Sequence, residues 1–199
     1  MNRTFNDAIE HRRTYYSITN SSPVSDDQIR EIVEFAVRHV PSAFNSQTSR
    51  VVVLLGANHL RLWEITKQTL RAIVPRAAFA STEAKIDSFA AGYGSVLYFE
   101  DQEIVRDLQK KFPLYADNFP VWSSQASAMH QFSIWTMLED VGFGASLQHY
   151  NPLIDNAVCA EWKLPQTWKL IAQMPFGEPT SEPGQKQIDS IEKRVLILR

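Results

Sequence analysis

The segment from residue 122 to residue 141 constrains the fold of this chain more than any other part of its sequence. Its apolar side chains recur at helical spacing, but they fall on more than one face of the helix that they predict. A helix that is apolar nearly all round is buried inside a domain or between subunits. We therefore expect a long helix that is either central to the fold or part of an interface. Its apolar residues are Trp122, Ala126, Met129, Phe132, Ile134, Trp135, Met137, Leu138 and Val141.

The remaining segments predict about four strands and six or more helices, which alternate only loosely along the chain. This loose alternation favours an α+β fold over a doubly wound parallel sheet. Ser25 is a typical N-terminal cap for the helix that follows it. No repeat or linker interrupts the 199 residues, so we expect one domain over residues 1–199. The expected helices cover residues 5–12, 26–40, 60–74, 82–90, 102–111, 122–141 and 153–161, the expected strands cover 50–55, 95–99, 145–149 and 168–174, and a proline-containing loop covers 112–121.

The sequence Val195-Leu196-Ile197-Leu198 near the C-terminus is apolar throughout. Exposing four aliphatic side chains in a row to water is unfavourable. We expect this tail to pair with a sheet, either in its own subunit or in another. Residues 177–187, which are rich in glycine and proline, predict an extended excursion before the tail.

Charge and composition exclude several classes of partner. Lys and Arg total 20 against 22 for Asp and Glu, so the net charge is -2, which disfavours binding to a nucleic-acid backbone. The most apolar run, residues 51–55, is far shorter than the ~20 residues of a membrane-spanning helix. Cys159 is the single cysteine, so no intrachain disulfide can form. We expect a soluble protein of the cytoplasm without a nucleic-acid or membrane partner.

Motifs for several kinds of catalysis are absent from the sequence. It has neither the glycine-lysine phosphate loop of nucleotide hydrolases nor the serine elbow of α/β-hydrolases. Gly142-Phe143-Gly144 begins like a dinucleotide fingerprint, but Leu147 replaces the third glycine and the segment follows a helix instead of a strand. No two of the five histidines have metal-ligand spacing, so we expect no metal site. No residue stands out as a catalytic nucleophile or base.

Three segments suit a bound cofactor, although each also has a plain structural interpretation. Arg12-Arg13-Thr14 offers guanidinium forks and a hydroxyl to a phosphate, or forms a solvated charged turn. Residues 41–47 contain amide side chains that can read the edge of a uracil-like ring, or that cap a turn. Residues 142–149 contain glycines that allow close approach of the backbone to a ligand, or that end a helix.

The order and spacing of these three segments resemble the FMN-dependent nitroreductase family over nearly the whole chain. The most specific match is Pro41-Ser42-Ala43-Phe44-Asn45-Ser46-Gln47, which in the family reaches the flavin of the partner subunit. The resemblance implies a phosphate site at the first segment, contacts beside the flavin ring at the third, and a basic residue near the C-terminus that returns to the phosphate. Tyr16 stands where many members have Lys or Arg near the flavin N1 and O2 atoms. The implied cofactor-binding residues are Arg12, Arg13, Thr14, Tyr16, Pro41, Ser42, Phe44, Asn45, Gln47, Ser146, Leu147 and Arg194.

The run R-R-T-Y-Y, the short length and the run G-A-S-L-Q-H-Y-N-P further resemble the fatty-acid-repression-mutant-like subgroup of this family. The resemblance implies a three-layer fold with a central, mostly antiparallel sheet flanked by helices, in a homodimer that exchanges C-terminal arms. It also implies that NADH or NADPH passes hydride to FMN at N5, and that a nitroaromatic, quinone or related electrophilic acceptor then takes it in the same pocket. Two alternatives remain open: a flavin-binding regulatory or stress-response protein with weak turnover, and an interaction domain without a cofactor.

Overall fold

The structure of the protein is a computed structural model that describes residues 3–199, and a five-stranded sheet lies at its centre. Every pair of strands in these residues is antiparallel, with the order β1-β5-β3-β2 and with β4 also paired to β5. All eight residues of β3 are buried. The expected antiparallel sheet is therefore confirmed. The strands are β1 (Ile18–Thr19), β2 (Ser49–Leu55), β3 (Gly94–Asp101), β4 (Gly144–Ala145) and β5 (Trp168–Pro179).

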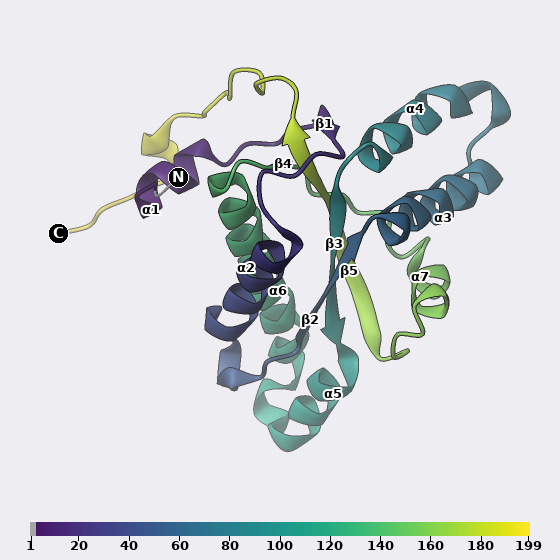
Figure 1. Cartoon of the computed structure of the whole chain (residues 1–199). Coiled ribbons are helices and arrows are strands. Elements are labelled where there is room, and N and C mark those ends of the chain that lie inside the picture. The colour runs from purple at the N-terminus through teal and green to yellow at the C-terminus, as the bar shows by residue number, and fades with distance from the viewer. Residues whose placement is uncertain (1–2) are drawn as a thin grey trace.

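Helices cover both faces of the sheet and give the protein three layers (Figure 1). Side chains of β3 alternate between the faces, because successive residues of a strand point in opposite directions. Leu97 and Phe99 belong to the hydrophobic cluster under α3, α4 and α7, whereas Val96 and Tyr98 belong to the cluster under α2 and α6. The sheet therefore separates two cores. The helices are α1 (Phe5–His11), α2 (Asp26–His39), α3 (Ala57–Ile73), α4 (Phe79–Ala90), α5 (Gln102–Lys111), α6 (Phe119–Asp140) and α7 (Asp155–Glu161).

Local sequence signals set the starts of two helices. Ser25 forms a capping box with Gln28, in which the Ser25 hydroxyl accepts the Gln28 N–H and the Gln28 side chain accepts the Ser25 N–H. Asp101 caps α5 by accepting the N–H of Glu103 at 3.2 Å. Both starts agree with the sequence prediction.

α6 differs from its prediction in where it begins and in how far it is buried. It begins at Phe119, inside the expected loop, because proline is tolerated in the first turn of a helix, where Pro120 lies. Met129 is 41% exposed and Phe132 is 40% exposed, so one chain does not enclose this helix on all sides. Polar residues such as Glu139 are buried instead. Neither α6 nor any other helix in residues 3–199 is long and apolar enough to cross a membrane.

The ends of the sheet also differ from the sequence prediction. β4 contains only two residues where a strand over residues 145–149 was expected, although Gln148 adds an isolated bridge to Gln173. β5 continues to Pro179 and so includes the start of the expected excursion. β1 was not expected at all. Because β1 and β4 both form by pairing with the last residues of β5, no local periodicity in their own sequence predicts them.

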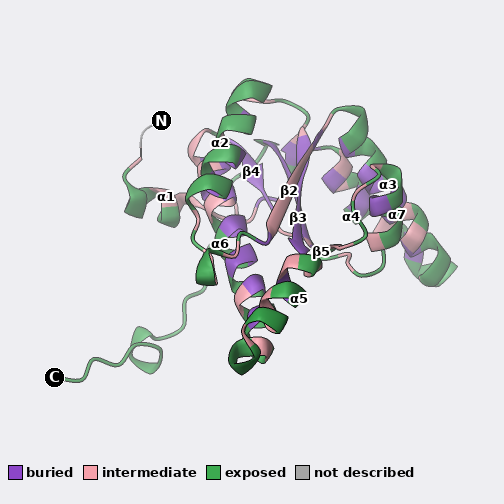
Figure 2. Cartoon of the chain, turned by 90° about the horizontal axis from the view of Figure 1, so that it is seen from below, coloured by how far each residue is buried: buried purple, intermediate pink, exposed green. Residues whose placement is uncertain are grey.

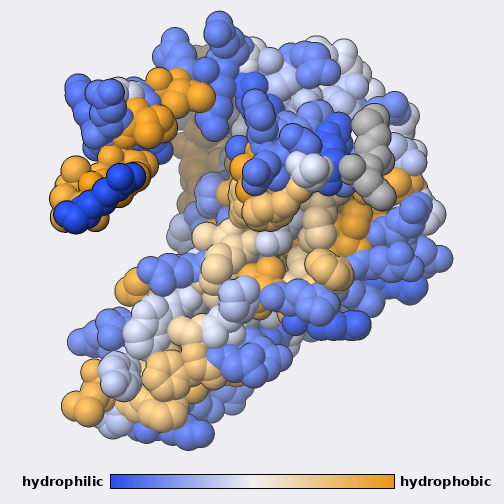
Figure 3. Space-filling view, turned by 90° about the vertical axis from the view of Figure 1, so that its left-hand side faces the viewer, coloured by the Kyte–Doolittle hydropathy of each residue, from blue (hydrophilic) through white to orange (hydrophobic). Residues whose placement is uncertain are grey.

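The C-terminal tail extends away from the rest of the chain (Figure 2). Leu196 is 81% exposed and Leu198 is 84% exposed, and neither pairs with a strand in the part of the chain that the structure describes. The expectation of pairing within its own subunit is therefore wrong, because the chain leaves β5 on the side of α1 and runs outside the sheet (Figure 1). Pairing with another subunit stays a prediction. Figure 3 shows apolar side chains on this tail and on the face that it overhangs.

Candidate cofactor site

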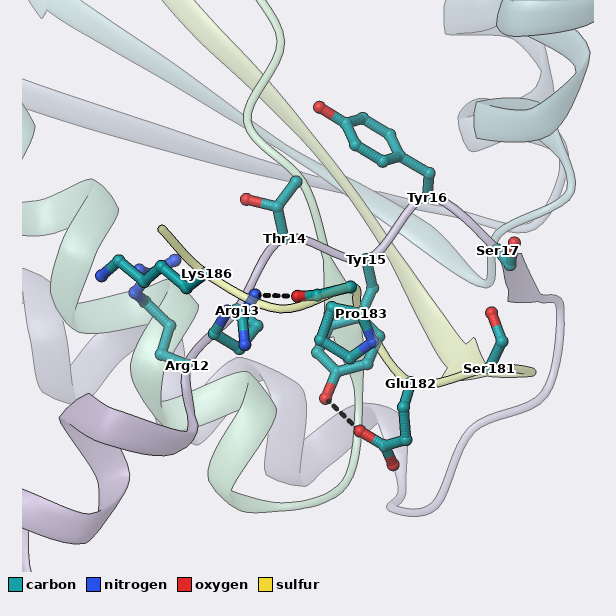
Figure 4. A pocket seen from close by; sticks show the side chains of 11 residues that line it. Arg12, Arg13, Thr14, Tyr15, Tyr16, Ser17, Ser181, Glu182, Pro183 and Lys186 are labelled. Carbon is teal, nitrogen blue, oxygen red and sulfur yellow. Dashed lines mark hydrogen bonds between the residues drawn. The ribbon is translucent and has the colours of Figure 1, made fainter. Parts of the chain in front are cut away.

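A cavity of about 430 Å³ lies where the segment after α1 meets the segment after β5. Residues 12–17 form one wall, and residues 181–184 with Lys186 form the other (Figure 4). The first of the three predicted segments therefore lines a cavity, as phosphate binding requires.

The first and third predicted segments meet beside this cavity. The N–H of Tyr15 donates to the carbonyl of Ala145 at 2.9 Å, and Thr14 forms a parallel bridge with Ala145. Glycine at position 144 makes this close approach possible, because a Cβ atom on Gly144 would lie 2.8 Å from the side chain of Tyr15. Backbone pairing thus joins two motifs that are far apart in the sequence.

The C-terminal turns of α6 support the arginine pair. The Arg12 guanidinium lies over the ring of Trp135, 4.5 Å from its centroid, in cation–π geometry. The backbone N–H of Arg13 donates to the carboxyl group of Glu139 at 2.8 Å. The helix therefore holds one arginine through its side chain and the other through its backbone.

The cavity carries more positive than negative charge. Arg12, Arg13 and Lys186 contribute three cationic groups, and Glu182 contributes one carboxyl group, which leaves a balance of two positive charges. The sequence analysis did not single out Lys186, because it lies in a segment that showed only an extended excursion. Its position two residues after Gly184 carried no pattern that could have identified it.

Hydrogen bonds link the two walls of the cavity. The Nη2 atom of Arg13 donates to the Gly184 carbonyl at 2.5 Å, and the Tyr15 hydroxyl donates to Glu182 at 3.4 Å. Burial raises the pKa of Tyr15, and the negative charge of Glu182 raises it further. Tyr15 therefore keeps its hydroxyl proton as a donor near neutral pH.

Glu139 is a second residue that the sequence analysis missed, although an acidic side chain in an apolar helical pattern was a visible signal. It is fully buried. Burial raises the pKa of Glu139. The hydrogen bonds from Arg13 and Trp135 and the positive charges of Arg12 and Arg13 lower the pKa, but by less than burial raises it, so the pKa is about 8. Its charge therefore changes close to neutral pH.

The residues of this cavity fit the phosphate of FMN. Guanidinium forks, an ammonium group and a hydroxyl are the donors that proteins use for phosphate. Arg12, Arg13, Lys186 and Thr14 bring these donors to one cavity. Two surplus positive charges match the charge of a phosphate monoester, which approaches minus two at neutral pH.

Residues Pro41–Gln47 lie away from this cavity, and none of them lines it. They include the short helix η1 (Ala43–Asn45) and lead into β2. Phe44 packs among aromatic rings of α6 and of the turn before it. Its ring centroid lies 5.0 Å from that of Phe112, 5.4 Å from that of Phe119 and 5.7 Å from that of Trp122.

The backbone of the same segment is strained. Phe44, Asn45 and Gln47 have φ values of 58°, 51° and 48°, in the left-handed region that residues other than glycine rarely adopt. The N–H of Gln47 donates to the hydroxyl of Ser42 at 3.0 Å and closes the turn. Strained backbone of this kind clusters at functional sites. Three such residues within the four positions 44–47 support a functional role for the segment.

The other predicted contact residues differ in how close they lie to the cavity. Tyr16 lines it, and its side chain points to the opposite side of the segment from Tyr15 (Figure 4). Ser146 is buried, and Leu147 packs at the margin of the core under α2 and α6. Arg194 is exposed in the C-terminal tail and does not line the cavity.

Two solved nitroreductases have this fold and are more than 30% identical to this chain. The nitroreductase CinD from Lactococcus lactis, in complex with nicotinic acid, is 43% identical with a TM-score of 0.91, covering 98% of this chain and 100% of that chain. A nitroreductase from Saccharomyces cerevisiae is 31% identical with a TM-score of 0.78, covering 88% of this chain and 96% of that chain. The fold and its cationic cavity therefore define an oxidoreductase of the nitroreductase class.

The chain belongs to the Nitroreductase family, whose family model matches residues 9–178. Two relatives come from Saccharomyces cerevisiae: HBN1 is 32% identical over 185 residues, 92% of each chain, and FRM2 is 34% identical over 184 residues, 90% of each chain. The name FRM2 stands for fatty acid repression mutant, so the similarity to FRM2 confirms the predicted subgroup. The family is FMN-dependent, so the chain is a flavoprotein oxidoreductase.

Proposed function

We propose that this protein uses NADH or NADPH to reduce nitroaromatic, quinone or related electrophilic acceptors by way of bound FMN. The observation that carries the proposal is the cationic cavity lined by Arg12–Thr14, beside which this segment pairs with the backbone of Gly144–Ala145. When bound, FMN supplies the hydride chemistry through its N5 atom. The residues of the chain bind and orient the cofactor, and none of them is assigned as catalytic.

Each wall of the cavity has a separate task in this proposal. Arg12, Arg13 and Thr14 hold the phosphate, together with Lys186 from the opposite wall. Thr14 and Tyr16 point to the same side of the extended segment (Figure 4). One FMN molecule can therefore place its phosphate at Thr14 and the edge of its ring at Tyr16. Ser146 and Leu147, which follow the residues paired with Thr14, line the edge of the ring.

A second copy of the chain completes the site in this proposal. Pro41–Gln47 does not reach the cavity of its own chain, so we assign it to the flavin of the partner. A groove of about 570 Å³ beside α1, α2 and α6 is lined by Phe5, Phe35 and Phe132, which are all exposed. Exposed apolar side chains that gather in this way suit a subunit interface. The projecting tail supplies the exchanged arm, and its Arg194 returns to the phosphate.

Complexes of a relative support the two substrates. CinD has been solved with nicotinic acid and with 4-nitrophenol, and the second complex is also 43% identical to this chain, with a TM-score of 0.90. Nicotinic acid has the pyridine ring of nicotinamide, and 4-nitrophenol is a nitroaromatic compound. Because the sequence contains no separate dinucleotide motif, we propose that both substrates use the same exposed face of the flavin in turn.

The proposal treats residues 1–199 as one cytoplasmic domain. Both ends of the described chain build the cavity, because residues 12–17 face residues 181–186 across it. Cys159 is buried and is the single cysteine of the sequence, which suits a reducing compartment.

Absorption spectra and steady-state kinetics test the proposal. We expect a yellow protein that oxidises NADH or NADPH when 4-nitrophenol or a quinone is present, with parallel double-reciprocal lines as the two substrates are varied. A yellow protein with turnover no faster than that of free FMN would favour the regulatory alternative. A colourless protein that binds no added FMN would contradict the proposal and favour an interaction domain.

A further inference from the structure

Glu139 is a fully buried carboxyl group beneath the arginine pair of the cavity. It lies one residue before the end of α6, and no ion pair within residues 3–199 involves it. Burying a carboxylate without a counter-ion is costly, so the group tends to become neutral instead. Its protonation state therefore matters to whatever binds next to it.

Two hydrogen bonds connect Glu139 to Arg13 and to Trp135, the residue whose ring lies under Arg12. Its Oε2 atom accepts the backbone N–H of Arg13 at 2.8 Å, and its Oε1 atom accepts the indole N–H of Trp135 at 2.5 Å. The Arg12 guanidinium lies over that indole ring. One carboxyl group thus orients Arg13 through its backbone and Arg12 through the ring beneath it.

Charged and titratable groups approach Glu139 from three directions. The segment after α1 contributes the two arginines, and the segment after β5 contributes the carboxyl group of Glu182. The next residue of α6, Asp140, forms an ion pair with Arg3. A phosphate bound in the cavity adds negative charge on the side of the arginines. These groups are Arg12, Arg13 and Tyr15, then Glu182 through its bond to Tyr15, and Asp140 with its partner Arg3.

A phosphate favours the neutral form of Glu139, because like charges in one site disfavour ionisation of both. Burial has already raised the pKa of this carboxyl group to about 8. At neutral pH Glu139 is therefore protonated in most molecules, and its neutral carboxyl group does not repel the negative phosphate. Above pH 8 the carboxyl group is ionised in the empty site and must take up a proton when the phosphate binds.

We propose that Glu139 is a positioning residue that must be protonated when the flavin phosphate binds at Arg12–Thr14, so that in alkaline solution binding takes up one proton from solvent. The proton returns to solvent when the phosphate leaves. The inference rests on the proposed function, because it requires the phosphate in this cavity. It makes cofactor retention strongest below pH 8 and weaker as the pH rises further.

Release of flavin from the diluted holoenzyme tests this coupling, with the fluorescence of free FMN as the readout. If the bound form keeps its proton, linkage makes FMN binding about tenfold weaker at pH 9 than at pH 7. The second ionisation of the phosphate, with a pKa near 6, is nearly complete at pH 7. Burial and the charge of Arg3 lower the pKa of His11, and burial raises that of Tyr15, so neither group titrates within this range.

Three variants separate Glu139 from its surroundings. Glu139→Gln should retain FMN to the same degree at pH 7 and pH 9. The control Asp140→Asn, which changes the neighbouring carboxyl group, should keep the pH dependence of the wild type. Trp135→Phe removes one N–H bond to the ionised carboxyl group while keeping a ring under Arg12, so the pH at which FMN is released should rise.

The outcomes distinguish this inference from the proposed function. If Arg12→Ala loses FMN but Glu139→Gln keeps the wild-type pH dependence, the phosphate site stands and the role of Glu139 is wrong. A wild-type protein whose FMN retention does not change between pH 7 and pH 9, or an unchanged release pH in Trp135→Phe, overturns the inference as well. If Arg12→Ala retains FMN at every pH, the phosphate does not lie in this cavity and the proposed site fails.

Discussion

The two neighbouring arginines of the cavity differ in how they are held. Arg12 rests on the ring of Trp135, whereas the side chain of Arg13 donates to the Gly184 carbonyl across the cavity. A side chain that is already ordered loses less entropy when it binds a ligand. Arg13 has to exchange an internal hydrogen bond for a new one, so Arg12 is the better prepared of the two to bind a phosphate.

We expect Arg12→Ala to release much of the FMN, because a charge-assisted hydrogen bond contributes about 1.5–3 kcal/mol. That free energy corresponds to about ten- to hundredfold weaker binding. The measurement is the flavin content after dilution and gel filtration. Arg30→Ala serves as the control, since Arg30 is exposed and pairs with Asp27 and Glu34 on its own helix. Equal flavin content in the two variants would contradict a phosphate site at Arg12.

In the proposed site, Tyr16 is a neutral side chain at the position where the family resemblance implies a cation in many members, and we expect this difference to affect the reduction potential of the flavin. Two-electron reduction brings negative charge to the N1–O2 edge of the ring. A cation there stabilises the reduced form and raises the reduction potential, whereas the phenol group of a tyrosine offers one hydrogen bond and no positive charge. We therefore expect a flavin that is harder to reduce and, once reduced, a stronger donor.

Tyr16→Lys should raise the midpoint potential of the bound flavin. About 1.4 kcal/mol of differential stabilisation corresponds to about 30 mV for a two-electron couple. Spectroelectrochemical titration of both proteins at full flavin occupancy measures the change. Tyr16→Phe is the control, because it keeps the ring and adds no charge. A potential that stays the same or falls in Tyr16→Lys would show that residue 16 does not lie at the pyrimidine edge.

Single residues also show what the sequence could and could not predict about the site. Arg12-Arg13-Thr14 forms a motif because its donors are adjacent, and the structure places it on the wall of a cavity. Glu139 and Lys186 are not part of a run of neighbouring donors. The acidic side chain of Glu139 in an apolar helical pattern was a signal of burial, but only the fold shows that Glu139 and Lys186 lie beside the arginine pair.

The turn at Phe44–Gln47 shows how packing can hold a strained element. Three residues with positive φ cost free energy, and the aromatic rings around Phe44 hold the turn in this form. The rigid turn presents Asn45 and Gln47 in fixed positions on the exposed side. In the proposed dimer this arrangement delivers their amide groups to the partner's flavin already ordered.

Gln47→Gly should separate strain from function. Glycine adopts positive φ readily, so we expect the free energy of unfolding to stay within about 1 kcal/mol of the wild type or to rise. FMN binding should weaken, because the side-chain amide is lost. Lys163→Gly is the matched control, since Lys163 also has a positive φ, 52°, but lies outside the predicted site. Urea unfolding and FMN titration of both variants give the answer, and unchanged FMN affinity in Gln47→Gly would remove this residue from the site.

Elements with their own periodicity or caps could be predicted, and elements made by pairing could not. α2, α5 and β2 carry apolar spacing and capping residues within their own sequence, so their positions agree with the prediction. β1 and β4 have two residues each and exist because both pair with the end of β5. β4 nevertheless positions the candidate site, since Thr14 and Tyr15 both pair with its Ala145.

The apolar pattern of α6 describes an assembly better than it describes one chain. The sequence predicts burial on nearly all sides of this helix, yet Met129 and Phe132 are exposed in the single chain. Phe132 lines the same groove as Phe5 and Phe35. A sequence records that a side chain is apolar but not whether its own chain or a partner covers it, so the interface could be anticipated and its geometry could not.

The C-terminal arm gives the most direct test of that assembly. Deleting residues 195–199 removes four aliphatic side chains, each contributing about 1.5–3 kcal/mol if a partner covers it fully. We expect the truncated protein to dissociate at higher concentration than the wild type and to lose FMN, because the proposed site spans both subunits. Sedimentation velocity over a range of concentrations, recorded also at the flavin absorbance, measures both effects.

Two controls separate the arm from the residues at its ends. Removing Arg199 alone should change neither the dimer nor the flavin content, because the apolar side chains remain. Arg194→Ala should weaken FMN binding while the dimer persists, because it removes the phosphate ligand and keeps the arm. A protein lacking residues 195–199 that stays dimeric and fully yellow on dilution would show that the exposed tail does not bind the partner subunit. This conclusion would hold whether or not Arg194→Ala weakens FMN binding.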